Sequence, residues 1–170
     1  MRRLLVVALA LVALVSCSGG ETPSRSSTVP SAAETAAPIA NSPQDVEFVR
    51  AVNAACKAYA DSDAALDDPR ESEDYVPFME SFIANSARLD DEFARLDPPA
   101  AFAGFDAYAK RNRDQTDILR AAAPKVAEAV RDDDLARADA VIDQAIDDFN
   151  TISDELEPDA RRFGFTECAG

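Results

Sequence analysis

The chain of 170 residues has no histidine. Hydrolytic triads use histidine as their general base, and most zinc and di-iron sites use it as a ligand. Its absence therefore excludes the usual triads, the zinc hydrolase sites and the Glu-x-x-His di-iron bundle. No other catalytic, metal-binding or nucleotide-binding motif stands out in the sequence. We therefore predict a protein that is not an enzyme, with no catalytic residues, no bound metal and no cofactor.

No hydrophobic run is long enough for a permanent membrane span, which needs about 20 apolar residues. The longest run, over residues 4–15, follows two arginines and ends in Leu14-Val15-Ser16-Cys17. An aliphatic residue three positions before a cysteine is typical of a lipoprotein signal peptide, in which the thiol accepts a diacylglyceryl group and the preceding residues are removed. We therefore predict a signal peptide over residues 1–16, lipidation at Cys17 and an extracytoplasmic, lipid-anchored location at the cell membrane.

Basic residues are scarce, with 17 lysines and arginines against 32 acidic residues and a net charge of −15. Cleavage before Cys17 removes two arginines and no acid, which leaves 15 basic residues and a net charge of −17. Nucleic acid and anionic lipid headgroups repel such a chain. We expect no nucleic-acid partner, and contact with the membrane through the N-terminal lipid alone. An acidic surface most often serves solubility, but an envelope protein with a basic surface is a candidate partner.

Cysteine is also scarce, and lipidation of Cys17 would leave only Cys56 and Cys168. Disulfides persist outside the cytoplasm, where an even pair most simply forms one bridge. A redox role would favour a Cys-x-x-Cys spacing, which the sequence lacks. We therefore predict a structural disulfide between Cys56 and Cys168.

Residues 17–43 are rich in Ser, Thr, Pro, Ala and Gly and contain no large aromatic residue. This composition cannot bury enough apolar surface to order the chain, so it predicts a lipidated N-terminus followed by a disordered linker. From Val46 onward, apolar residues recur every three or four positions, and no segment alternates with a period of two. The later part of the chain is therefore predicted to be helical.

Prolines, glycines and acidic runs divide this part into four amphipathic segments. We expect helices over residues 46–66, 75–96, 102–130 and from 135 to at least 156. Pro124 should kink the third helix or end it early, and Pro158 should bend the fourth. The Asp132–Asp134 run should cap the start of the fourth helix, and Gly164 its end. Short polar connections then predict an all-α domain over residues 44–170, an antiparallel up-and-down four-helix bundle.

The predicted disulfide is compatible with this topology. In such a bundle the fourth helix ends beside the start of the first, and Gly164 can reverse the chain there. The following residues are long enough to bring Cys168 back along the first helix to Cys56. Phe165 would then plug the open end of the core.

Three short motifs are present in this helical part: Val52-Asn53-Ala54-Ala55-Cys56, the pair Pro98-Pro99 and the C-terminal Phe-Gly-Phe-Thr-Glu-Cys-Ala-Gly. Together with the signal sequence they make the chain similar to small helical lipoproteins of actinobacteria, although Val52 stands where that group usually has alanine. The resemblance implies a secreted helical fold anchored by lipid. It implies no activity.

Asn112 and Thr116 are polar residues on the predicted core face of the third helix. They can form a satisfied polar layer that fixes the register of the helices. Alternatively, they can line a small polar pocket, faced by Ser86 and Tyr59, that binds a ligand. The polar layer is the commoner arrangement and the one we prefer.

Two functions are compatible with these features. The first is a non-enzymatic envelope module that binds another protein, with the linker giving it reach. The alternative is a carrier or sensor of a small molecule or lipid held between the helices. A filled core would favour the first function, and a cavity of a few hundred Å³ the second.

Overall fold

The computed structural model describes residues 40–169. The predicted signal peptide, the lipidation of Cys17 and most of the predicted linker lie outside these residues. The described part contains four helices and no strand, so the all-α prediction is confirmed: α1 (Pro43–Asp63), α2 (Tyr75–Arg95), α3 (Phe105–Arg131) and α4 (Leu135–Phe163). Three short turns of 3₁₀ helix accompany them, η1 (Ser72–Asp74), η2 (Ala100–Phe102) and η3 (Thr166–Cys168). Within residues 40–169, no helix combines the length and apolarity needed to cross a membrane.

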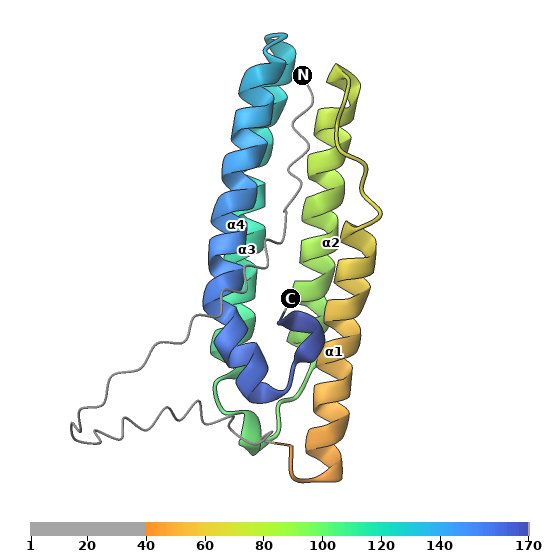
Figure 1. Ribbon diagram of the computed structural model, residues 1–170, viewed down its shortest axis with the longest axis vertical. Helices are drawn as coiled ribbons and strands as arrows, with labels where there is room; N and C mark the ends of the chain where they lie inside the picture. Colours follow the sequence, from red (N-terminus) through yellow and green to blue (C-terminus); the bar gives the residue numbers. More distant parts are fainter. Residues whose placement is uncertain (1–39, 170) are drawn as a thin grey trace, which may run out of the picture. The chain divides into compact units, whose positions relative to one another are not determined.

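Successive helices run in opposite directions and pack in chain order, α1 on α2, α2 on α3 and α3 on α4 (Figure 1). The longest two helices, α3 and α4, lie side by side along the whole bundle. In contrast, α1 accompanies only one half, and residues 64–74 run from its end to the far end of α2. The C-terminal segment after α4 folds back, and its turn η3 contacts both α1 and α4.

Side-chain caps fix where α1 and α4 begin. The Ser42 hydroxyl accepts a hydrogen bond from the Asp45 backbone N–H at 3.1 Å, and the Asp45 carboxylate accepts one from the Ser42 N–H at 2.9 Å. Pro43 occupies the first turn, where its missing N–H costs nothing. Pro43, which we assigned to the linker, therefore belongs to α1, and Ser42, also assigned to the linker, is the N-cap of that helix. Asp134 caps α4 by accepting a hydrogen bond from the Arg137 N–H, as the acidic run predicted.

Gly164 ends α4 in the left-handed conformation, with φ +81°, as predicted. Neither proline ends its helix: α3 continues through Pro124, and α4 continues through Pro158 to Phe163. Both prolines lie on exposed faces, where water can reach the carbonyl group that loses its backbone donor. Of the two outcomes expected at Pro124, a kink or an early end of the helix, the early end was therefore wrong.

Two other predicted helix boundaries were wrong. The third helix begins at Phe105 and not at Phe102, because Gly104 has φ +114° and separates η2 from α3. Phe102 is nevertheless buried, within η2. The first helix ends at Asp63, three residues before the predicted end, in a turn closed by the Leu66 N–H and the Asp63 carbonyl at 3.0 Å.

The buried side chains form two cores, one toward each end of the bundle. The first, here called the aromatic core, lies where α1 and the C-terminal segment cover α2, α3 and α4. Its rings belong to Phe48, Phe93, Phe102, Phe105, Tyr108, Phe163 and Phe165. The buried residues of the second, here called the aliphatic core, come from α2, α3 and α4. Small and aliphatic residues dominate it, including Met79, Leu119, Ala122, Val126, Ala129, Ala138, Ile142 and Ala145.

Candidate functional site: a cavity between the two cores

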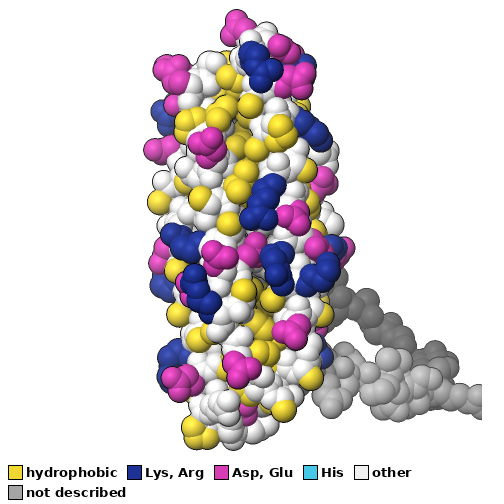
Figure 2. All heavy atoms as spheres, turned by 180° about the vertical axis from the view of Figure 1, so that it is seen from behind, with side chains coloured by type: hydrophobic (Ala, Val, Ile, Leu, Met, Phe, Trp, Pro, Cys, Tyr) yellow, Lys and Arg dark blue, Asp and Glu magenta, His cyan; other side chains and the backbone are white. Residues whose placement is uncertain are grey.

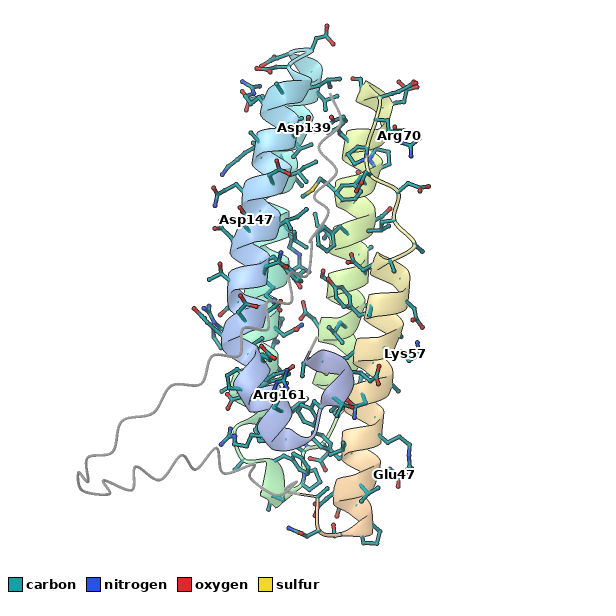
Figure 3. The ribbon with its side chains drawn as sticks, viewed as in Figure 1. Glu47, Lys57, Arg70, Asp139, Asp147 and Arg161 are labelled. Atoms are coloured by element: carbon teal, nitrogen blue, oxygen red, sulfur yellow. A yellow bond between two sulfur atoms is a disulfide. The ribbon has the colours of Figure 1, made fainter. Side chains whose placement is uncertain are left out.

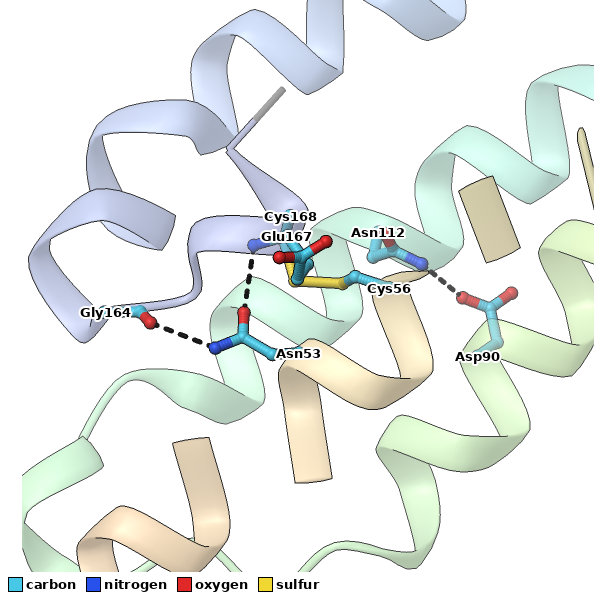
Figure 4. The surroundings of a disulfide bond; sticks show 7 residues. All are labelled: Asn53, Cys56, Asp90, Asn112, Gly164, Glu167 and Cys168. Atoms are coloured by element: carbon cyan, nitrogen blue, oxygen red, sulfur yellow. Dashed lines mark hydrogen bonds between the residues drawn. A yellow bond between two sulfur atoms is a disulfide. The ribbon is translucent and has the colours of Figure 1, made fainter. Parts of the chain in front are cut away.

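A layer of polar side chains separates the two cores. Asp90 on α2 is only 7% exposed, and its carboxylate accepts hydrogen bonds from Asn112 Nδ2 at 2.9 Å and Thr116 Oγ1 at 2.7 Å. Figure 4 shows the Asn112 amide directed at Asp90. No basic side chain forms an ion pair with Asp90 within residues 40–169. The layer therefore holds a buried carboxylate through two neutral donors, as such a group requires.

Gln115 connects the same layer to α4. Its Nε2 donates to the Phe149 carbonyl at 3.0 Å and to Ser153 Oγ at 2.6 Å. Ser86 on α2 differs from these residues: its Oγ is the buried side-chain polar atom that lacks a hydrogen-bond partner in the described part of the chain. Buried hydroxyl groups are usually paired, so Ser86 requires an explanation.

A cavity of about 400 Å³ lies beside this layer. All four helices and the C-terminal segment line it, and Tyr59, Ser86, Asn112 and Thr116 are all among its lining residues. These are the four residues of the ligand pocket that we gave as the alternative to a polar layer, and the structure brings them to one cavity. In the same structure, Asn112 and Thr116 donate hydrogen bonds to Asp90. The polar layer and the cavity are therefore both present.

Asp90 was missed from the sequence. It follows Leu89, so it lies one position outside the apolar stripe of period three to four that marks the core face of the second helix. A usable signal was its position four residues after Ser86, which places two polar side chains on the same stripe of α2. Gln115 was missed for a similar reason, since it immediately precedes Thr116.

The mouth of the cavity is acidic. Asp154 and Glu157 on α4 and Glu167 in η3 are lining residues, and no lysine or arginine is among them. Glu157 accepts a hydrogen bond from Arg161 Nε at 2.8 Å, whereas Asp154 and Glu167 form no ion pair within residues 40–169. The field at the mouth therefore favours a positive charge.

Two basic side chains lie close to the acidic mouth without lining the cavity: Arg161 bonds to Glu157, and the pKa of Lys57 is raised mainly by Asp61 and to a smaller degree by Glu167. Lys57 points outward from α1 and pairs with Asp61 at 2.7 Å (Figure 3). Seen from behind the view of Figure 1, lysine and arginine side chains gather across the middle of the bundle, with acidic side chains among them (Figure 2).

Two tyrosines line the cavity. Burial raises the pKa of the Tyr108 hydroxyl to about 12, with the Asp159 charge adding to the effect. Burial also raises the pKa of Tyr59, the Asp63 charge adds to this, and a hydrogen-bonding approach of the Ser86 hydroxyl opposes it. Tyr59 is therefore the polar neighbour of Ser86 Oγ, although this approach is too long or too bent to count as a hydrogen bond, and Ser86 Oγ stays without a partner in that stricter sense. Both tyrosines stay protonated at neutral pH and can donate or accept hydrogen bonds.

The Cys56–Cys168 disulfide forms part of the cavity wall, and its presence confirms the predicted pairing. Asn53 holds the same segment: its Nδ2 donates to the Gly164 carbonyl at 3.2 Å, and its Oδ1 accepts from the Glu167 N–H at 3.0 Å (Figure 4). Phe165 is fully buried among the rings of the aromatic core, as predicted. The C-terminal segment is therefore fixed at three points, and Glu167 and Cys168 have defined places at the cavity.

Residues 40–169 contain no group of three or more cysteine, aspartate or glutamate side chains arranged to hold a metal ion. No protein-family model, no curated protein and no solved structure matches this chain. The candidate site therefore rests on its own geometry.

Proposed function

We propose that this protein is an extracytoplasmic lipoprotein whose helical bundle binds a small molecule in the cavity between its two cores. The observation that supports the proposal is the unpartnered Ser86 hydroxyl in the wall of a cavity of about 400 Å³. Cavities of 300 to 1,000 Å³ with mostly apolar walls and a few placed polar groups are the usual form of small-molecule sites. A ligand that bonds to Ser86 would satisfy that hydroxyl.

A set of three compounds with one apolar body tests this function. The compounds are 4-phenylbutylamine, 4-phenylbutanol and 4-phenylbutanoate, titrated against the full chain in nanodiscs and followed by ligand-observed NMR, with empty nanodiscs as the blank. We expect saturable binding of at least one compound. Ser86→Leu should abolish it by filling the cavity, whereas Ser81→Leu, an equal change at an exposed site on α2, should not. Absence of binding by all three compounds contradicts the proposal.

The anchor is a separate part of the proposal and rests on Cys17. Cys17→Ala should prevent lipidation, because no other residue supplies a thiol at the cleavage junction. The variant should then leave the membrane fraction during a carbonate wash that wild type resists. A variant that stays with the membranes would show that the anchor lies elsewhere.

Binding of an envelope protein, the function that we preferred from the sequence, requires no cavity. It stays a prediction based on the acidic composition. The cavity and its unpartnered hydroxyl favour the carrier or sensor alternative.

A further inference from the structure

We propose that the ligand is an organic cation, an amine with an apolar body, whose charged head faces the acidic mouth and whose N–H groups bond to acceptors in the wall. This inference rests on the proposed function, because it specifies the ligand of the same cavity. It follows from which hydrogen-bonding atoms the wall leaves open, from one unpartnered hydroxyl and from the charges at the mouth.

The two carboxamides of the wall have their donors engaged and their acceptors open. Asn112 must turn Nδ2 toward Asp90, because a carboxylate only accepts hydrogen bonds, so its Oδ1 is the open atom. Gln115 turns Nε2 toward the Phe149 carbonyl and Ser153 Oγ, which leaves Oε1 open in the same way. Neither oxygen accepts a hydrogen bond from the described residues. The wall therefore offers carbonyl oxygens to a ligand that donates.

The unpartnered Ser86 hydroxyl is an independent observation at the same wall. Ser86 is 2% exposed and lines the cavity, so water reaches it only through the cavity. A hydroxyl can accept or donate, and a ligand N–H would complete its hydrogen bonding. The interior thus presents acceptors at Ser86, Asn112 and Gln115, and no charged donor.

The negative charges at the mouth of the cavity also favour a cationic ligand. Within residues 40–169, Asp154 and Glu167 form no ion pair, although the Lys57 ammonium lies within electrostatic reach of Glu167, and none of the described residues that line the cavity is a lysine or an arginine. A carboxylate or phosphate ligand would meet these charges without a cationic partner, which is unfavourable. An ammonium group would be attracted to them.

Aromatic rings in the cavity wall provide apolar surface for the body of the ligand. The rings of Tyr59 and Phe149 stack with centroids 6.5 Å apart, and both residues line the cavity. Leu89 and Leu156 add aliphatic surface. Aromatic faces attract cations as well as apolar groups, so they accommodate both parts of an amphiphilic amine.

The three 4-phenylbutyl compounds distinguish this inference from the proposed function, because they differ only in the head group. We expect 4-phenylbutylamine to bind the full chain at least about tenfold more tightly than 4-phenylbutanol, and 4-phenylbutanoate to bind least. The double variant Asp154→Asn, Glu167→Gln should bring the affinity for the amine close to that for the alcohol and leave the alcohol unchanged. Asp143→Asn with Asp147→Asn makes the same charge change at exposed positions of α4 that do not line the cavity, and should preserve the preference.

The outcomes separate the two proposals. Binding of the alcohol or the carboxylate as tightly as the amine would overturn the cationic class and leave the cavity function standing. If the Asp154→Asn, Glu167→Gln variant keeps the full preference for the amine, the cationic class is overturned too, because the acidic side chains at the mouth would then not cause the preference. If none of the three compounds binds, the cavity function itself fails.

Discussion

The aromatic core and the aliphatic core fill the space between their helices with side chains of different size. In the aliphatic core, α2, α3 and α4 carry four fully or nearly fully buried alanines, so the helices approach closely without a fourth helix. The aromatic core must also hold α1 and the C-terminal segment, and seven rings fill that wider space. Small residues allow close helix packing, and large rings fill the distance between more separated helices.

The cavity lies at the boundary between the aromatic core and the aliphatic core. Tyr59, in the last turns of α1, packs against both cores, and beyond it α1 contributes no further helix. Asp90, Asn112 and Thr116 stand at this level in place of apolar side chains. A polar layer specifies one register but packs less completely than a hydrocarbon core. The space beside the layer is therefore a consequence of the change from one type of core to the other.

Removing the disulfide, which fixes the C-terminal segment to the aromatic core, should lower the free energy of unfolding more than any other change considered below. The bridge joins residues 112 positions apart, and in the loop-entropy view a closed loop of about 100 residues contributes about 4 to 5 kcal/mol. We expect Cys56→Ser with Cys168→Ser to lose free energy of unfolding of this order in urea melts. Wild type treated with a reductant is the matched control and should give the same value. A loss below about 1 kcal/mol would show that the rings alone hold the C-terminal segment.

Truncation of one large side chain in each core compares them directly. Phe165→Ala should cost about 3 to 5 kcal/mol, because Phe165 is fully buried and contacts five other rings. Leu119→Ala in the aliphatic core should cost about 2 to 5 kcal/mol. Chemical unfolding at unchanged slope measures both. If Phe165→Ala costs less than Leu119→Ala, the C-terminal segment is not an integral part of the aromatic core.

Asn112→Leu tests the layer between the cores. Leucine would leave the buried Asp90 carboxylate with Thr116 as its one donor, so we expect a loss of about 1 to 3 kcal/mol. Asn112→Asp is no suitable control, because it would place two carboxylates together. Ser86→Ala is suitable, since it removes a hydroxyl without a partner from the same cavity and should cost little. A rise in the urea midpoint of Asn112→Leu would mean that filling the cavity outweighs the loss of the hydrogen bond.

Much of this arrangement could be predicted from the sequence, for physical reasons. The period of three to four identified all four helices, and the caps at Asp134 and Gly164 act through local backbone geometry that a short segment encodes. The pairing of Cys56 with Cys168 followed from the small number of cysteines and the length of the tail. Asn112 and Thr116 were visible because polar residues interrupt an apolar stripe.

The errors concern features that depend on tertiary context. Pro124 does not end α3 early, because whether a proline breaks a helix depends on which face it occupies. The short reach of α1 could not be predicted, since periodicity gives the direction of a stripe but not the axial offset of one helix against another. Asp90 was missed because its burial depends on two donors supplied by a different helix.

The smallest expected effect compares a tyrosine of each core at alkaline pH. Burial raises the pKa of Tyr108 in the aromatic core to about 12, whereas a hydrogen bond to Asp139, at 2.7 Å, is the main cause that raises the pKa of Tyr75 in the aliphatic core to about 12. An unfolded tyrosine ionises near pH 10, so above that pH the unfolded chain loses protons that the folded protein keeps, and the free energy of unfolding falls.

Each of these tyrosines should therefore account for a loss of about 1 kcal/mol between pH 9 and pH 11, and its change to phenylalanine should remove that loss. Asp139→Asn separates the two causes, because it removes the charge beside Tyr75 and leaves Tyr108 as it is. The free energy of unfolding of Asp139→Asn should fall less between pH 9 and pH 11 than that of wild type. Adding Tyr75→Phe to Asp139→Asn should reduce this fall little further, whereas adding Tyr108→Phe should reduce it by as much as it does in wild type. Urea melts at pH 9 and pH 11 measure these differences. An effect of Asp139→Asn on the Tyr108 contribution would show that the two ends of the bundle are electrostatically coupled across the polar layer.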